Sequence, residues 1–352
     1  MQTFFTFIFL VFLIFGKLCS AQTEFEELIR YYNSEKNFSG VVLVATNGIT
    51  DYLGYAGMSD IRNKIPFSKD TKFKIASMTK VFTAVIVMKL VEDGRLNLDS
   101  PVGTYFPDYK GEGRDKVTLH HLLTYSSGIE NQADALGMRP YQTKHSIDDF
   151  IDKYCSGKLI KEPGSESNYS NTEYIILHKI IESVTGRSYE ENLEAMILRP
   201  LGLKNTGMCN SDIIMNDLTI SYTYNDSLNA LNEDEPFLPE MYFGSGFMYS
   251  TAEDMLNFDK AIFENVILNS GSTAKLLAIN KVLGYTAYGF WGSDGWGSFD
   301  EKFYYRTGGI LGSTSNWIHT MKTGKSIIIL SNTNAVDLYG LSEKLYLIST
   351  NR

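Results

Sequence analysis

Several kinds of functional site are missing from this 352-residue sequence. It has three cysteines and five histidines, without an H-E-x-x-H pair, and the adjacent His120 and His121 would point about 100° apart on a helix. With 41 acidic against 32 basic residues, a formal net charge of −9 and no basic run, the chain lacks the features of a nucleic-acid-binding protein. We therefore expect no metal, no cofactor and no nucleic-acid partner.

One common hydrolase motif and one common nucleotide-binding motif are also absent. No G-x-S-x-G turn occurs, so a Ser-His-Asp hydrolase of that kind is unsupported. The run Gly324 to Ser326 ("GKS") would need a glycine at position 319 to form a phosphate-binding loop, and His319 stands there instead. The chain also lacks internal repeats and low-complexity linkers. A single unit over residues 22–352 is the expected organisation.

The N-terminal apolar run, residues 4–16, is too short to cross a bilayer, which takes about 20 residues. Small residues at Cys19 and Ala21 favour cleavage before Gln22, so residues 1–21 are interpreted as a signal peptide. The protein would then be exported, either periplasmic or secreted, with no stable membrane span in the mature chain. An uncleaved N-terminal anchor helix is the alternative. The two remaining cysteines, Cys155 and Cys209, could form one disulfide or stay as independent thiols.

Strand patterns at both ends enclose a helical middle. Residues 39–57 alternate around the turn pair Asn47-Gly48, which predicts a hairpin. Residues 285–292, 302–308, 313–321 and 325–332 are rich in aromatic and β-branched residues, which favours strands. The expected fold is α/β (α+β): a mostly antiparallel sheet flanked by terminal helices, formed by about residues 22–65 and 281–352, with an inserted helical lobe at about 66–280.

Capping residues set the expected bounds of the helices. They place Thr118 as the N-cap of one helix and Asn171 as the N-cap of another that ends at Gly186. Ser188 with Glu191 and Ser250 with Glu253 each form a capping-box pattern. The remaining helices are expected at residues 24–32, from Ser77 to about Gly94, and at residues 339–347.

The tetrad Ser77 to Lys80 opens a long apolar helix, so its two polar side chains share one face at i and i+3. A serine hydroxyl needs a base beside it to act as a nucleophile. A lysine can be that base when burial lowers its pKa from about 10.4. The alternative is a helix N-cap followed by a surface lysine.

Two later stretches offer matching chemistry. Tyr169 and Asn171 form a Y-x-N at a helix start, where the phenol could relay a proton and the amide could orient a substrate. Arg306, Thr307 and Gly308 end a strand, where the first two could bind a carboxylate and the glycines let the backbone approach a ligand. The alternatives are a helix cap with a packing aromatic, and a hairpin turn with a surface arginine.

Together these motifs resemble those of the serine β-lactamase and penicillin-binding-protein superfamily, which are S-x-x-K, then S-x-N or Y-x-N, then K-T-G. The second motif has a tyrosine, and in this it resembles the class C β-lactamase-like branch. Further similar stretches have the same order and spacing: "TLHHLLTYSSGI", "ILRPLGLKNTG", "GSGFMYSTAEDM" and "YGFWG".

The resemblance implies a role for each matching residue. Ser77 would be the acylated serine, Lys80 its proton partner and Tyr169 the second acid/base. Asn171, Arg306, Thr307 and Gly308 would bind substrate, and the N–H groups of Ser77 and Gly309 would form the oxyanion hole. The chain departs from the family at Arg306, which replaces a lysine or histidine, and at Tyr125, which replaces a histidine.

The implied function is an exported serine hydrolase that acts through an acyl-enzyme. Its substrate would be a D-amino-acid peptide, a β-lactam or a small ester. The peptide could be derived from peptidoglycan. The alternative is a non-catalytic penicillin-recognition, sensor or binding protein on the same scaffold.

Overall fold

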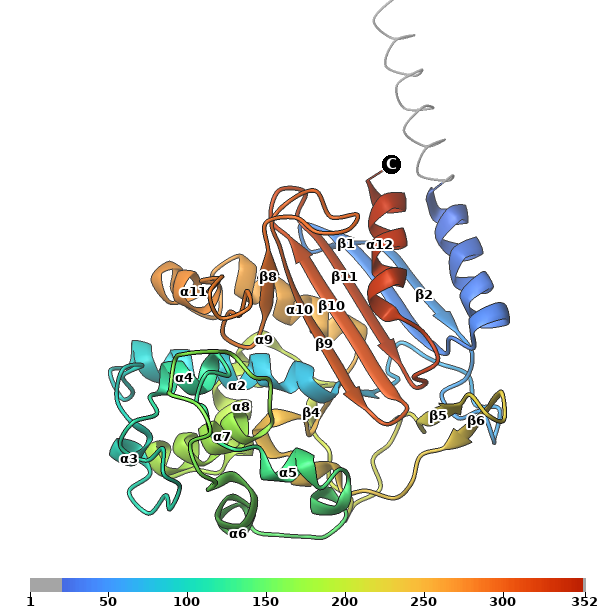
Figure 1. Cartoon of the computed structure of the whole chain (residues 1–352). Coiled ribbons are helices and arrows are strands. Elements are labelled where there is room, and N and C mark those ends of the chain that lie inside the picture. Colours follow the sequence, from blue (N-terminus) through green and yellow to red (C-terminus); the bar gives the residue numbers. More distant parts are fainter. Residues whose placement is uncertain (1–20, 351–352) are drawn as a thin grey trace, which may run out of the picture.

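The computed structural model describes residues 21–350, and its centre is a six-stranded sheet in the order β2-β1-β11-β10-β9-β8 (Figure 1). Its neighbouring strands all pair antiparallel. The strands are β1 (Gly40–Thr46), β2 (Ile49–Ala56), β8 (Trp291–Ser293), β9 (Phe303–Ile310), β10 (Ser313–Thr320) and β11 (Lys325–Ser331). The predicted α/β fold with a mostly antiparallel sheet is confirmed. The predicted signal peptide lies outside the described residues, except for position 21.

Both faces of the central strands are covered, which explains their unbroken apolar runs. Alternate side chains of β1 and β11, such as Val42 and Ile327, pack against the helix at residues 21–36 and α12 (Leu338–Ser349). The intervening side chains, such as Leu43 and Ile328, belong to the larger core on the opposite face. Figure 1 shows the two terminal helices side by side on one face of the sheet. The predicted flanking by terminal helices is confirmed.

The inserted region is mostly helical but also holds two small sheets. Its three-stranded sheet has the order β3-β7-β4 and its two-stranded sheet pairs β5 with β6. These strands are β3 (Phe73–Lys74), β4 (Gly207–Met208), β5 (Tyr222–Asn225), β6 (Ala230–Glu233) and β7 (Met248–Ser250). The α-helices are α2 (Thr79–Glu92), α3 (Val102–Tyr105), α4 (Leu119–Leu123), α5 (Gln132–Ala135), α6 (Ile147–Phe150), α7 (Thr172–Thr185), α8 (Tyr189–Leu193), α9 (Arg199–Leu201), α10 (Ala252–Phe263) and α11 (Ser270–Leu276). Although α10 falls within the predicted lobe, it packs on β1 and β11 and so joins the lobe to the sheet.

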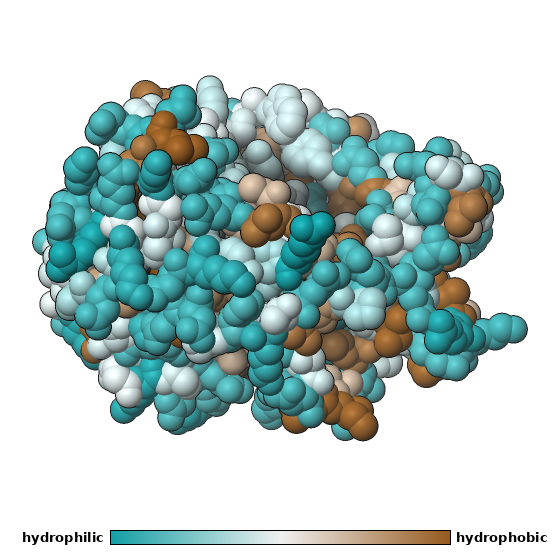
Figure 2. All heavy atoms as spheres, turned by 60° about the horizontal axis from the view of Figure 1, so that its bottom comes forward, coloured by the Kyte–Doolittle hydropathy of each residue, from teal (hydrophilic) through white to brown (hydrophobic). Residues whose placement is uncertain are grey.

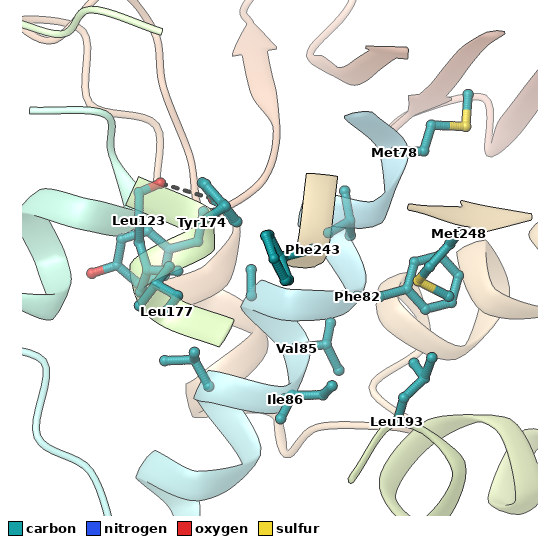
Figure 3. Close-up of a cluster of buried hydrophobic side chains, with 14 of the residues drawn as sticks. Met78, Phe82, Val85, Ile86, Leu123, Tyr174, Leu177, Leu193, Phe243 and Met248 are labelled. Atoms are coloured by element: carbon teal, nitrogen blue, oxygen red, sulfur yellow. Dashed lines mark hydrogen bonds between the residues drawn. The ribbon is translucent and has the colours of Figure 1, made fainter. Parts of the chain in front are cut away.

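Helix α2 lies at the centre of the larger core. Most of its side chains are buried, so it lacks the polar face of a surface helix. Phe82 stacks on Phe258 of α10 with ring centroids 3.8 Å apart. Figure 3 shows Phe82, Val85 and Ile86 of α2 among apolar side chains from other elements. This packing holds the first turn of α2 rigidly, which matters because the candidate nucleophile precedes it.

Local sequence signals placed several elements correctly. Asn47 and Gly48 both adopt positive φ, as a tight two-residue hairpin turn between β1 and β2 requires. Helix α7 ends at Gly186 in the left-handed conformation, and Ser188 forms the expected capping box with Glu191 at the start of α8. Thr118 caps α4 as predicted.

The predicted cap of α10 was wrong by one residue. Thr251, rather than Ser250, is the N-cap, and its side chain accepts a hydrogen bond from the Asp254 amide. Ser250 ends β7 instead, and its hydroxyl bonds to that of Thr206. Two adjacent hydroxyl residues gave equivalent sequence signals, and strand pairing decided between them.

The predicted strand at residues 285–292 is a strand only at its end, where β8 begins at Trp291. Tyr285 and Gly289 have positive φ, and a Cβ on Gly289 would lie 2.9 Å from Val81 Cα. The segment therefore bends to fit closely against α2. From this loop, Tyr288 and Phe290 pack into the larger core, whereas Tyr285 is exposed.

Three further features of the described residues concern membrane-spanning helices, the two cysteines and the surface. No helix within residues 21–350 is long and apolar enough to cross a membrane. Cys155 and Cys209 are both buried free thiols, so the predicted alternative of two independent thiols applies in this structure. The face shown in Figure 2 is largely hydrophilic, with hydrophobic residues in small groups.

Candidate active site

Ser77 lies in a short 3-10 turn, Ala76–Met78, that leads directly into α2. The preceding Ala76 is buried and has φ of 47°, a left-handed conformation that is unfavourable for alanine. The turn is held against the sheet, because the Ser315 hydroxyl of β10 donates to the Ile75 carbonyl at 3.1 Å. Ser77 is thus presented by a fixed, strained turn at the helix N-terminus.

Lys80 is fully buried at 0% exposure, so the alternative of a surface lysine is wrong. Its Nζ donates to Ser77 Oγ at 3.2 Å, to Asn171 Oδ1 at 2.7 Å and to the Ser245 carbonyl at 2.8 Å. Burial lowers the pKa of Lys80 to about 8, and the charge of Arg306 acts in the same direction. The amine can therefore exchange a proton with Ser77 near neutral pH.

Tyr169 lies in the loop before α7 and brings its hydroxyl to 2.5 Å from Ser77 Oγ. Tyr169 is 40% exposed, while its hydroxyl accepts a hydrogen bond from the buried Arg306. Burial by itself would raise the pKa of Tyr169, but the charges of Lys80 and Arg306 outweigh this and lower it to about 8. The phenol is thus a second group that can take the Ser77 proton.

Arg306 is also fully buried at 0% exposure, and it lies within β9 rather than in a turn. The alternative of a hairpin turn with a surface arginine is therefore wrong. Its Nε donates to the Ser77 carbonyl at 2.8 Å, and its two terminal nitrogens donate to the hydroxyls of Tyr125 at 2.9 Å and Tyr169 at 3.0 Å. The guanidinium thus joins the nucleophile's backbone to two phenols.

Tyr125 is a site residue to which sequence reasoning assigned no role. It follows α4 with φ of 56°, is buried, and stacks on Trp291 with ring centroids 5.6 Å apart. Burial raises the pKa of Tyr125, so it stays a neutral phenol beside Arg306. Its position before "SSG" was visible as a departure from the family. Only the fold shows that this departure and the one at Arg306 are in contact.

The two glycines of β9 have different environments. A Cβ on Gly308 would lie 2.4 Å from the Ile75 carbonyl oxygen and 3.1 Å from Ser77 N, so only glycine fits. A Cβ on Gly309 would have no atom within 4 Å, and Gly309 borders the same pocket as Ser77. The two predicted oxyanion-hole residues therefore face one space, and their role stays a prediction.

A pocket of about 430 Å³ opens over Ser77. Sequence reasoning anticipated six of the residues that line it: Ser77, Tyr169, Asn171, Arg306, Thr307 and Gly309. It missed the other four: Tyr242, Gly246, Trp291 and Ile310. Gly246 and Trp291 lie in the family-like stretches "GSGFMYSTAEDM" and "YGFWG", to which no role was assigned, and Ile310 directly follows Gly309. Tyr242 lies in a 3-10 helix, Pro239–Ser245, that no motif marks.

Asn171 stands at the N-cap position of α7, but its side chain makes no capping bond, so the alternative of a helix cap alone is wrong. It accepts from Lys80, and its amide nitrogen donates to the Tyr141 hydroxyl at 3.3 Å and to Asp134 Oδ1 at 3.4 Å. These contacts fix the orientation of the amide at the edge of the pocket.

Within residues 21–350, no three His, Cys, Asp or Glu side chains are grouped so that they could hold a metal ion.

The site and fold agree with comparisons to known proteins. The sequence model of the Beta-lactamase family matches residues 25–347, so the chain belongs to that family. The chain is 26% identical over 323 residues to a Bacillus subtilis (strain 168) protein, PbpX, whose name describes a penicillin-binding protein; the match covers 90% of this chain and 77% of that one.

Two further proteins extend the comparison. Protein flp of Staphylococcus aureus (strain NCTC 8325 / PS 47) is 26% identical over 337 residues, a match that covers 92% of this chain and 66% of flp. The solved structure of D-amino acid amidase from Ochrobactrum anthropi SV3 superimposes with a TM-score of 0.80 at 24% identity, covering 95% of this chain and 99% of the amidase. This likeness shows a shared fold, and the family membership supports a hydrolase.

Proposed function

We propose that the protein is a serine hydrolase that cleaves an amide or ester bond through an acyl-enzyme on Ser77. One observation carries the proposal. Ser77 Oγ lies within hydrogen-bonding distance of both the Tyr169 hydroxyl and Lys80 Nζ, and the pKa of each of these two groups is lowered to about 8. A hydroxyl with two such neighbours can lose its proton near neutral pH.

The proposal includes the proton transfers. The Ser77 proton passes to the Tyr169 phenolate or to neutral Lys80 as Oγ attacks the substrate carbonyl. The N–H groups of Ser77 and Gly309 would stabilise the negative oxygen that forms. The same proton then goes to the leaving nitrogen or oxygen, the bond to the leaving group breaks, and water hydrolyses the acyl-enzyme by the reverse sequence.

Arg306 takes part in this scheme without moving a proton. A guanidinium stays charged at every relevant pH and cannot accept a proton. Its contact with the Tyr169 hydroxyl stabilises the phenolate form, and its contact with the Ser77 carbonyl holds the strained turn. We therefore describe Arg306 as a residue that tunes Tyr169 and positions Ser77.

The substrate candidates are a D-amino-acid peptide, a β-lactam, a small ester or a peptide derived from peptidoglycan. The name of one structural neighbour, a D-amino acid amidase, supports an amide substrate. Export to the periplasm or the medium is part of the proposal, and it rests on the apolar run at residues 4–16.

Covalent labelling tests the proposed function. The pure protein is incubated with a fluorescent fluorophosphonate, which reacts with activated serines, and Ser77→Ala is the matched control. We expect the unaltered protein to be labelled and Ser77→Ala to remain unlabelled. Absence of label on the unaltered protein would favour a non-catalytic binding or sensor protein on this scaffold.

A further inference from the structure

Binding of a substrate carboxylate in the pocket would require a positively charged group that the substrate can reach. Among the described residues that line the pocket, Arg306 is the one with a cationic side chain. Recognition of a carboxylate beside the scissile bond would therefore depend on this guanidinium.

Arg306 is committed to the protein itself. Each of its three nitrogens donates to a protein oxygen, and its side chain has no exposed surface. Its guanidinium carbon also lies 4.8 Å from the Trp291 ring centroid and 5.2 Å from that of Tyr169. A guanidinium has five N–H groups, so two remain beyond these three bonds. Because the side chain has no exposed surface, a substrate carboxylate could reach them only if Arg306 moved, which would leave the buried Tyr125 hydroxyl without its donor.

Lys80 is equally unavailable. It is fully buried, and its three donor positions are taken by Ser77, Asn171 and the Ser245 carbonyl. An ammonium group has three N–H donors and no more. The second buried cation of the site thus has no hydrogen left for a substrate anion.

The remaining surface of the pocket favours neutral groups. Thr307 is exposed and offers one hydroxyl, which can bond to an ester or amide carbonyl as readily as to a carboxylate. Tyr242, Trp291 and Ile310 supply apolar surface. At the Asn171 edge, the exposed carboxylate of Asp134 lies 3.4 Å from the amide nitrogen and would repel an anion.

We propose that this site selects esters and amides whose leaving group is uncharged. It discriminates against substrates with a carboxylate next to the scissile bond, such as a peptide cleaved at its last bond or the ring carboxylate of a β-lactam. The Tyr125 hydroxyl takes one of the N–H donors of Arg306. This inference rests on the proposed function and narrows its substrate class.

A matched pair of esters tests the selectivity. N-acetyl-D-alanyl-D-lactate and its primary amide share the same scissile ester and differ only in the charge next to it. Release of N-acetyl-D-alanine is followed by chromatography, and each rate is divided by that of the uncatalysed reaction. We expect kcat/KM for the neutral amide to exceed that for the acid by at least about tenfold.

Variants at position 307 test the physical cause. Thr307→Lys places an uncommitted cation in the pocket and should narrow the ratio of the two kcat/KM values by at least about fivefold. Thr307→Gln has a long uncharged side chain and should leave that ratio unchanged. An equal response of the ratio in the two variants would show that charge is not the cause and would overturn the inference.

The outcomes separate this inference from the proposed function. Absence of fluorophosphonate label on Ser77 would reject the proposed function itself. A labelled protein that hydrolyses both esters equally, or prefers the acid, is a serine hydrolase for which the inference is wrong. The same conclusion follows if the labelled protein fails to hydrolyse the neutral ester.

Discussion

Replacement of Arg306 by glutamine should move the pH dependence of hydrolysis to higher pH. In the unaltered protein, one terminal nitrogen of Arg306 donates to the Tyr169 hydroxyl at 3.0 Å. This positive charge favours the phenolate and so lowers the pKa of Tyr169. Because the phenolate is one of the two proposed acceptors of the Ser77 proton, loss of the charge should reduce the active form at neutral pH. The ascending limb of the kcat/KM profile should therefore shift upward.

The size of the shift follows from the distance between the charges. Two unit charges about 4 Å apart interact by about 4 kcal/mol at an effective dielectric constant near 20, which corresponds to about three pKa units. Solvent reduces this effect because Tyr169 is 40% exposed, and Lys80 still supplies a positive charge. We expect a shift of about one to two pH units after screening.

The assay measures kcat/KM for p-nitrophenyl acetate between pH 5 and pH 10, and the rate of the uncatalysed hydrolysis is subtracted at each pH. Arg306→Lys is the matched control, because it keeps the charge but offers one nitrogen in place of three. Its ascending limb should stay near that of the unaltered protein, while kcat falls because the contacts to the Ser77 carbonyl and to Tyr125 are no longer all made. A glutamine variant whose profile superimposes on the unaltered one would refute the reasoning.

Two further predictions concern the lysine and the glycines. Lys80→Met keeps the volume and removes the amine, so kcat should fall by about 100-fold or more without loss of the folded state by circular dichroism; a fall of less than about threefold would exclude Lys80 as proton partner. Gly308→Ala should lower the thermal midpoint, because its Cβ would lie 2.4 Å from the Ile75 carbonyl, at a cost of about 1–3 kcal/mol. Gly309→Ala should leave the midpoint within about 2 °C, and equal midpoints for the two variants would contradict the described close approach.

Much of the fold was predictable because local signals and burial patterns agree. The Asn47-Gly48 turn fixes a hairpin on its own, since few other residue pairs accept two positive φ values. Helix α7 was bounded correctly by the residues at its two ends. Residues 285–290 were not predictable in this way, because their aromatic and β-branched composition matches a strand while their close fit against α2 requires a loop.

In the candidate site, too, residues that are close in the sequence were predictable, and contacts between distant residues were not. Ser77 and Lys80 were found because they are three positions apart at the start of a helix, a spacing that brings two side chains to one face. The contact between Arg306 and Tyr125 joins residues 181 positions apart in the sequence, and no local pattern encodes it. Burial of Arg306 also changes how its charge is interpreted, because a fully buried guanidinium bonds to groups of the protein. The sequence predicts a group that binds substrate, a role that stays a prediction, and the structure adds that the guanidinium bonds to Ser77 and Tyr169 of its own chain.

Trapping the acyl-enzyme tests the central claim most directly. The protein is mixed with excess p-nitrophenyl acetate, quenched in acid within milliseconds and digested, and the peptides are analysed by mass spectrometry. The account predicts an acetyl group on the peptide that contains Ser77, at the position of Ser77 itself, and its absence in Ser77→Ala. Turnover by the Ser77→Ala variant at the unaltered rate, or acetylation at another residue alone, would contradict it.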